Sequence, residues 1–274
     1  MKKVMLLLVV AASVNCSLFA VEDASLQTSA KKEARPAILS YLATMDIIRK
    51  MEKAVNPRGV AKDIKSYVAT YNAELKMQQI SMKMINKFKA PNKIRTSIKI
   101  KGIPATIEAF DGKQAWSMVE GMGVREIIGP QLEFMKLSAK MSNFANNTKD
   151  IFEKVEVLKK TEIINGVSCY KVICYCPKEL NLPPVVVFAD MKTYFVKKSI
   201  MTVQTSMGKI LTESEFSDYK NAGGIIIAHK MTTSSMGITF TAELESMKTN
   251  CNIQDSDFKK PENGNEMGNG GKKI

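Results

Sequence analysis

The chain has one histidine and one tryptophan in 274 residues, and this scarcity restricts the chemistry available to it. An enzyme site brings together a base, a nucleophile or a metal ion in convergent positions. His229 follows Ile225 and Ile227 on one predicted strand face and has no partner at metal-ligand spacing, so we expect a barrel-interior residue with satisfied hydrogen bonds. We therefore expect that the protein is not an enzyme and has no catalytic residue, no metal site and no cofactor.

Cysteine is also scarce, and its spacing excludes two kinds of site. Cys174 and Cys176 share a strand face while Cys169 points the other way, which matches neither a structural zinc site nor a Cys-x-x-Cys redox pair. Neighbours on one strand face are poorly placed to bond each other. We expect these three residues and Cys251 to be buried small hydrophobic residues, and one disulfide to Cys251 is the alternative.

Long apolar runs are absent after the first residues, and nothing later approaches the roughly 20 apolar residues that span a bilayer. The start of the chain has two lysines and then an apolar run up to Ala12, as in a secretory leader. We expect a signal peptide over residues 1–20, cleaved after Ala20, and a periplasmic protein. The alternative is a lipid anchor on Cys16.

The charge is strongly one-sided, with 40 basic against 27 acidic residues and a formal net charge of +13. A basic surface favours anionic partners, which include a membrane face, an acidic protein and nucleic acid. The basic residues lie on strand exteriors without interleaved aromatic residues, so we expect no nucleic-acid partner. An anionic membrane surface or an acidic protein remains.

Residues 79–118 contain two alternating patterns separated by Pro91-Asn92. Period-two alternation is typical of half-buried antiparallel strands. The pattern predicts a meander with an apolar concave face and a basic convex face. The apolar positions are Ile80, Met82, Met84, Phe88, Ile94, Thr96, Ile98 and Ile100. The opposite positions are Ser81, Lys83, Lys87, Lys89, Lys93, Arg95, Ser97, Lys99 and Lys101.

Further strands are predicted over residues 64–75 and in a long series from residue 155 to residue 248, whereas residues 120–128 are interpreted as a loop. A sheet of about 11–12 strands tends to curl, which hides its edges. The predicted fold class is mainly β, with an incomplete antiparallel β-barrel. We expect a single domain over residues 36–261, a mobile linker over 21–35 and a disordered tail over 262–274.

Two helices are predicted beside this sheet. Pro36 opens the first, and an apolar stripe that includes Ile38, Leu42 and Ile48 runs along it. The second follows Pro130, from Gln131 to about Ala145, and is apolar around most of its circumference, so it must be covered on more than one side. Each helix is either ordinary core or a lid or plug that also contacts a ligand.

Several motifs resemble the periplasmic lipoprotein carrier (LolA/LolB-like) family and its wider group of outer-membrane lipoprotein-sorting proteins. They are Lys89-Ala90-Pro91-Asn92, Asp111-Gly112-Lys113 with Trp116, Phe216-Ser217-Asp218-Tyr219 and Asp257-Phe258-Lys259-Lys260-Pro261. The resemblance implies an incomplete β-barrel whose mouth is closed by helices and whose cavity shelters acyl chains. The carrier usually has Arg directly before the Pro-Asn turn, where this chain has Ala90, so its gate is absent or built differently.

The resemblance also implies a function: binding and transport of lipids or acylated lipoproteins towards the outer membrane, between an inner-membrane donor complex and an outer-membrane acceptor. The alternative is a non-transporting envelope sensor or scaffold with the same fold. The expected acyl-chain contacts are Tyr71, Met82, Met84, Ile98, Ile107, Trp116, Leu132, Met135 and Phe144. The expected partner or anionic membrane surface is Lys87, Lys93, Arg95 and Lys99.

Overall fold

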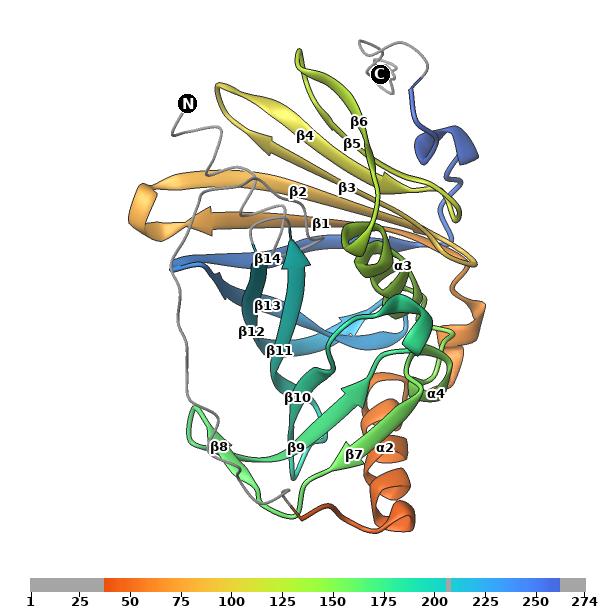
Figure 1. Cartoon of the computed structure of the whole chain (residues 1–274), viewed down its shortest axis with the longest axis vertical. Coiled ribbons are helices and arrows are strands. Elements are labelled where there is room, and N and C mark those ends of the chain that lie inside the picture. The colour runs from red at the N-terminus through yellow and green to blue at the C-terminus, as the bar shows by residue number, and fades with distance from the viewer. Residues whose placement is uncertain (1–36, 206–207, 262–274) are drawn as a thin grey trace.

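The structure is a computed structural model that describes residues 37–205 and 208–261, and it is mostly β (Figure 1). The predicted signal peptide, linker and tail lie outside the described residues. Within them, the helices are α2 (Tyr41–Val55), α3 (Pro130–Ser142) and α4 (Thr148–Ile151). None of these helices has the length and hydropathy of a membrane span.

Fourteen strands form one antiparallel sheet in the described part of the chain. They are β1 (Ser66–Leu75), β2 (Ile80–Lys89), β3 (Lys93–Ile100), β4 (Ile103–Phe110), β5 (Ala115–Val119), β6 (Gly123–Ile127), β7 (Lys154–Val157), β8 (Glu162–Ile164), β9 (Val167–Tyr175), β10 (Val185–Asp190), β11 (Val196–Thr205), β12 (Gly208–Ala222), β13 (Ile225–Ser235) and β14 (Ile238–Thr249).

The strand order is β6-β5-β4-β3-β2-β1-β14-β13-β12-β11-β10-β9-β7, with β8 paired to β9. The sheet curls but stays open between β6 and β7, which confirms the predicted incomplete barrel (Figure 1). It has two strands more than the predicted maximum. The predicted loop 120–128 contains β6, because Gly121 and Gly123 adopt positive φ angles (77° and 88°) in a tight turn after β5. The second addition arises because the strand predicted from residue 155 is split into β7 and β8.

Consecutive hairpins place their turns alternately at the two ends of the strands. Each of these two ends of the sheet is called an edge below. The β1–β2, β3–β4, β5–β6 and β13–β14 turns all lie at one edge, here named the hairpin edge (Figure 1). At the opposite edge, named the helix edge, the chain enters β1 after α2 and leaves β6 towards α3. The two edges therefore have different surroundings.

Helix α2 begins later than predicted. Its N-cap is Ser40, whose Oγ accepts a hydrogen bond from Ala43 N (3.3 Å). Ile38 instead pairs with Leu158 in an isolated antiparallel bridge, so its assignment to the helix is wrong. Leu42 is 79% exposed, which contradicts its place in the buried stripe, whereas Ile48 is buried as predicted.

Helix α3 is covered on several sides, as its apolar circumference predicted. Met135 and Ala139 pack in a cluster with the helix-edge ends of β1–β6. Leu137 packs with α2, β7, β9 and β10 in a second cluster, and Phe134 contacts Leu182. The helix ends at Ser142, three residues before its predicted end, and lies between the two halves of the curled sheet (Figure 1).

Candidate functional site

Seven of the nine predicted acyl-chain contacts lie where the concave face was expected. This inner face is the side of the sheet that packs against α3. Tyr71, Met82, Met84 and Ile98 form part of one apolar cluster on β1–β3 and β14. Leu132, Met135 and Phe144 belong with Tyr71 to the cluster beneath α3. Met84 and Met135 are 0% exposed, so a ligand reaches them only if the packing around them opens.

Ile107 and Trp116 lie on the opposite, outer face, so their predicted position on the inner face is wrong. Ile107 pairs directly with Ser97, and Trp116 pairs with Ala109, which in turn pairs with Arg95. Directly paired residues of antiparallel strands share a face. The error has a physical cause: six consecutive residues of β4 are buried, so alternation cannot identify which face is the inner one.

A polar row crosses the inner face between the two apolar clusters. Asn86, Thr96, Glu108, Ser117 and Arg125 are successive register partners on β2–β6. Thr96 Oγ1 donates to Asn86 Oδ1 (2.9 Å), and Arg125 Nε donates to Ser117 Oγ (2.7 Å). Thr96, Glu108 and Ser117 are buried. The predicted uniformly apolar face therefore contains a band of hydrogen-bonding groups.

The first α2 groove lies between helix α2 and the segment from α4 to β7, and its volume is about 520 Å³. That volume is within the range of small-molecule sites, roughly 300–1,000 Å³. Its walls are apolar, while charged residues surround them. The lining includes Tyr41, Met45, Ile48, Phe152 and Val155, together with Arg49, Glu52, Lys149, Glu153 and Lys154.

The second α2 groove adjoins the first and has a volume of about 250 Å³. Both grooves are lined by Glu52, Asn147 and Thr148. At this shared boundary Glu52 Oε1 accepts a hydrogen bond from Thr148 N (2.8 Å), which fastens α2 to the first turn of α4. The apolar lining of the second groove includes Met51, Val55, Met141, Phe144, Ile151 and Ile225.

An aromatic stack leads from the second α2 groove into the core. The ring of Phe144 lies 5.1 Å from that of Tyr67, and Tyr67 lies 5.3 Å from Phe88. The Tyr67 hydroxyl donates to Ser142 O (3.2 Å), and burial raises the pKa of this hydroxyl, so it remains a neutral donor. The groove is therefore continuous with the cluster beneath α3.

The end of α3 is joined to the β2–β3 turn without the Arg of the lipoprotein carrier. Asn143 Nδ2 donates a hydrogen bond to Pro91 O (3.0 Å), and the Tyr67 bond to Ser142 O lies beside it in the chain. Ala90 donates its N–H to Lys65 O (2.8 Å), and its side chain packs against the cluster beneath α3. The link between the end of α3 and the β2–β3 turn therefore runs through Asn143, and the expectation about the gate stays a prediction.

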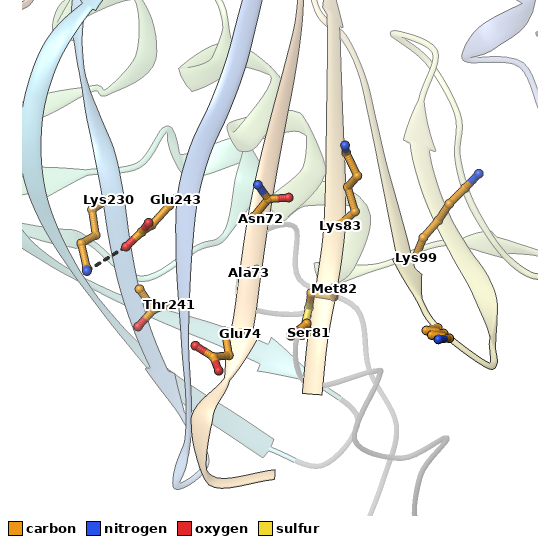
Figure 2. Close-up of a pocket in the computed structure, with 11 residues that line it drawn as sticks. Asn72, Ala73, Glu74, Ser81, Met82, Lys83, Lys99, Lys230, Thr241 and Glu243 are labelled. Carbon is orange, nitrogen blue, oxygen red and sulfur yellow. Dashed lines mark hydrogen bonds and ion pairs between the residues drawn. The ribbon is translucent and has the colours of Figure 1, made fainter. Parts of the chain in front are cut away.

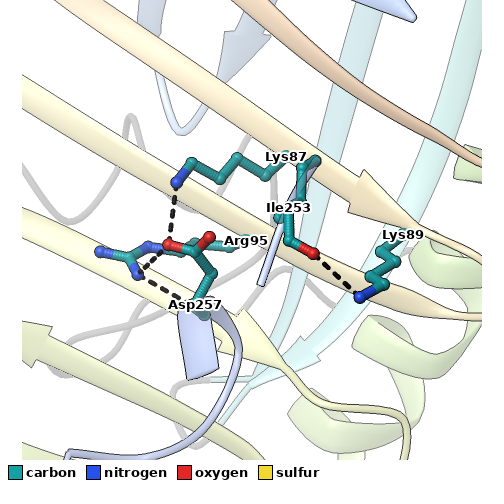
Figure 3. Close-up of polar contacts among 5 residues, drawn as sticks. All are labelled: Lys87, Lys89, Arg95, Ile253 and Asp257. Atoms are coloured by element: carbon teal, nitrogen blue, oxygen red, sulfur yellow. Dashed lines mark hydrogen bonds and ion pairs between the residues drawn. The ribbon is translucent and has the colours of Figure 1, made fainter. Parts of the chain in front are cut away.

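The basic outer row is largely occupied by the chain itself. Residues 250–258, here named the C-terminal clasp, lie across the outer face of β1–β5 (Figure 3). Lys87 Nζ contacts Asp257 Oδ1 (2.9 Å), and Arg95 Nη1 donates to Asp257 O (2.8 Å). Lys93 Nζ contacts Asp255 Oδ1 (3.0 Å). Of the four predicted surface residues, Lys99 alone lacks an acidic partner in the part of the chain that the structure describes.

Trp116 binds the C-terminal clasp through a hydrogen bond. Its Nε1 donates to Phe258 O (2.8 Å), and Phe258 is completely buried. Lys89 Nζ donates to Ile253 O (2.8 Å) and contacts Asp255 Oδ1 (2.8 Å). The contacts of Lys89 and then Lys93 with the Asp255 carboxylate hold its pKa down at about 2. The motif residues of the C-terminus thus stabilise the outer face.

The remaining candidates for chemistry in the described part of the chain are the cysteines and His229. Cys169, Cys174 and Cys176 are buried, as predicted, whereas Cys251 is only half-buried, so its predicted burial is wrong. Burial raises the pKa of Cys174 to about 12. His229 Nε2 is buried without a hydrogen-bond partner among the described residues, so its predicted satisfaction is wrong for this atom. Within residues 37–205 and 208–261, no group of three or more His, Cys, Asp or Glu side chains is placed to hold a metal ion.

Three solved structures share this fold. A DUF1329 family protein from Desulfovibrio piger is 13% identical with a TM-score of 0.50, over 80% of this chain and 96% of that chain. An outer membrane lipoprotein-sorting protein domain from Vibrio parahaemolyticus is 15% identical with a TM-score of 0.51, over 79% and 96%. A LolA superfamily protein from Nitrosomonas europaea is 11% identical with a TM-score of 0.51, over 79% and 97%.

These identities are too low to show more than a common fold. No protein-family model and no curated protein matches the sequence. The motif resemblance to the lipoprotein-sorting group is confirmed at the level of structure, and this chain has the open β-barrel-like fold of those proteins.

Proposed function

We propose that the protein binds the acyl chains of lipids or acylated lipoproteins in the two α2 grooves. The observation that carries this proposal is the continuity between the second groove and the core. Phe144 and Ile225 line that groove and also belong to the cluster beneath α3. An acyl chain that enters along α2 thereby approaches Tyr71, Leu132 and Met135, and it reaches them when the packing around them opens.

An acyl chain needs an apolar site because its exposure to water costs much free energy. Leaving an acyl chain in water costs about 0.8 kcal/mol per CH₂, so a long chain costs on the order of 10 kcal/mol unless it is covered. The apolar walls of the first groove supply this cover, and Arg49, Lys149 and Lys154 around them suit an anionic head group. Binding requires no covalent step, so the proposal includes no catalysis.

Helix α2 is the element that would move. Only Thr44, Ile47 and Ile48 of this helix are buried, and the Glu52–Thr148 hydrogen bond lies on the boundary of both grooves. Outward movement of α2 breaks that bond and joins the grooves. Similar folds in a lipoprotein-sorting domain and a LolA superfamily protein support carriage in the periplasm towards the outer membrane, between a donor complex and an acceptor.

Native mass spectrometry of protein purified gently from its own cells tests the proposal. We expect bound mass equal to a phospholipid or an acylated peptide. Met45→Glu places a charge in the first groove and is expected to lower uptake of a fluorescent fatty acid at least about tenfold. Leu42→Glu is the matched control, since Leu42 is exposed on the same helix outside the groove lining. Empty protein that also fails to take up the fatty acid contradicts the proposal.

A second candidate is a non-transporting envelope sensor or scaffold with the same fold. The complete burial of Met84 and Met135 favours it, because the inner face is filled by the side chains of the protein itself. This candidate predicts one stoichiometric protein partner and no bound lipid. The same mass spectra therefore distinguish the two functions.

A further inference from the structure

Three exposed methionines lie in the turns at the hairpin edge. Met77 is in the β1–β2 turn, Met122 in the β5–β6 turn and Met236 in the β13–β14 turn. They are 85%, 66% and 53% exposed. A single exposed apolar residue is ordinary on a protein surface. Three separate turns that each present one at the same edge form a pattern, and this edge is well separated in the fold from the helices (Figure 1).

A lysine-lined groove lies on the outer face behind the β1–β2 and β13–β14 turns, two of the three turns that carry these methionines. Its volume is about 660 Å³, and Lys83, Lys99, Lys101 and Lys230 are among its lining residues. Figure 2 shows Lys83 and Lys99 on neighbouring strands, both extending away from the sheet. Lys99 and Lys101 are exposed and adjoin the β3–β4 turn of the hairpin edge.

Acidic residues neutralise only part of this groove. Lys230 contacts Glu243 (2.8 Å), and Lys83 contacts Glu245 (2.9 Å). Lys99 and Lys101 have no ion-pair partner among the residues described by the structure. The groove therefore has two cations free to meet an external anion, although Glu74 is also part of its lining.

We propose that the hairpin edge docks on an anionic lipid bilayer. Met77, Met122 and Met236 enter the interface between head groups and acyl chains, where unbranched thioether side chains adapt to irregular surroundings. Lys99 and Lys101 then face the lipid phosphates, and the net charge of +13 adds a general attraction to the surface.

A bilayer fits these observations better than a protein partner. A stable protein interface buries roughly 800 Å² on each partner in a continuous, complementary patch. Here the apolar groups are single side chains on separate turns, and the groove behind them is polar. A lipid surface has no fixed shape, so it accepts separate apolar tips with cations behind them.

This inference goes beyond the proposed function and does not rest on it. The second α2 groove includes Ile225, which begins β13 at the helix edge, whereas the methionines lie at the hairpin edge. Docking through the hairpin edge leaves the α2 grooves uncovered. Vesicle binding and bound lipid mass therefore report on separate surfaces, and either one can fail alone.

Co-sedimentation with vesicles tests the docking surface. The probes are vesicles of phosphatidylglycerol and phosphatidylcholine in equal parts, and vesicles of phosphatidylcholine alone. We expect binding to the anionic vesicles, and a loss of about tenfold in affinity for each of Met77→Ser, Met122→Ser and Met236→Ser. Ile163→Ser is the matched control, because Ile163 is 74% exposed on β8, away from the hairpin edge. Every variant has the same N-terminus, so any contribution of residues 1–36 to vesicle affinity is the same in all variants and does not affect their comparison.

Two charge-reversal variants, one test and one control, examine the lysines separately from the methionines. The double variant Lys99→Glu with Lys101→Glu is expected to abolish the preference for anionic vesicles. The control Lys159→Glu with Lys160→Glu makes the same charge change at two exposed residues between β7 and β8 and is expected to retain it. Equal losses in test and control variants, or no binding to either vesicle, overturn the proposal. Self-association that the methionine substitutions abolish also overturns it, because the surface would then bind a second copy of the chain.

Discussion

On the outer face of β2 and β3, basic residues follow the strands from the helix edge to the hairpin edge. The two ends of this basic row have different neighbours. Near the helix edge, Lys93 contacts the C-terminal clasp, as do Lys87 and Arg95 (Figure 3). Near the hairpin edge, Lys99 and Lys101 line an open groove. The same alternating pattern therefore produces a structural contact at one end and an accessible cationic surface at the other.

The difference depends on what covers each end. The clasp brings two carboxylates to the lysines, its Ile253 and Asp257 carbonyl groups accept hydrogen bonds from Lys89 and Arg95, and it buries Phe258 against the sheet. Ion pairs that are partly shielded from water and share hydrogen bonds stabilise a fold more than exposed pairs do. We expect substitutions at the clasped end to change stability, and substitutions at the open end to leave it nearly unchanged.

Removal of the clasp anchor should have the largest effect. Phe258→Ala deletes a completely buried aromatic side chain, and such changes typically cost about 3–5 kcal/mol of unfolding free energy. Urea denaturation measures the change. Phe258→Leu, which keeps most of the apolar volume, should lose clearly less. If Phe258→Ala unfolds at the same urea concentration as the unchanged protein, the clasp does not stabilise the sheet.

Neutralising the central carboxylate of the clasp should have a smaller effect. Asp257→Asn weakens the contact with Lys87 (2.9 Å) and the longer one with Arg95 (3.7 Å), and we expect a loss of about 1–3 kcal/mol. Asp218→Asn is the control, because the Asp218–Lys220 pair is exposed and is expected to contribute about 0–1 kcal/mol. Equal losses in the two variants would remove the distinction between clasped and exposed pairs.

The clasp also marks where sequence-based prediction stops. The alternation of residues 80–101 predicted two strands and their basic face, because period two is a local property. The partners of Lys87 and Arg95 lie more than 150 residues later in the chain, and no local pattern in β2 or β3 reports them. The prediction of a basic surface available to partners therefore stays untested at these residues, which the clasp already contacts.

For the candidate site, too, the sequence predicted some residues correctly and others wrongly. Met84 and Ile98 were placed correctly on the inner face by alternation, whereas Ile107 was not, because β4 is buried on both faces. The polar row was missed for another reason. Glu108 and Arg125 each lie on a strand next to that of Ser117, and the three residues are seen to be neighbours only once the register is known. Glu108 within a strand of apolar residues is the one signal in the sequence that indicated a polar interior.

Acid should act on the clasp through Asp255. Its pKa in the folded protein is about 2, below the ordinary value of about 3.9, because Lys89 and Lys93 stabilise the carboxylate. A lowered pKa contributes stability that is complete above the unfolded-state value and is lost as the pH falls through the folded-state value. Melting temperatures measured between about pH 5 and about pH 2 should therefore fall more steeply for the unchanged protein than for Asp255→Asn. Parallel curves would show that this carboxylate has no part in acid sensitivity.

The open end of the row should give the smallest effect. Lys99→Ala and Lys101→Ala remove exposed side chains without an ion-pair partner among the described residues, so each should change the unfolding free energy by less than about 0.5 kcal/mol. Lys87→Ala, at the clasped end of the same row, is the matched comparison and should lose more, because Asp257 then keeps fewer cationic neighbours. A loss at Lys99 as large as that at Lys87 would mean that the open end also has a structural role. A small loss at Lys99 together with weaker vesicle binding assigns that lysine to recognition rather than to stability, although both residues belong to one alternating pattern.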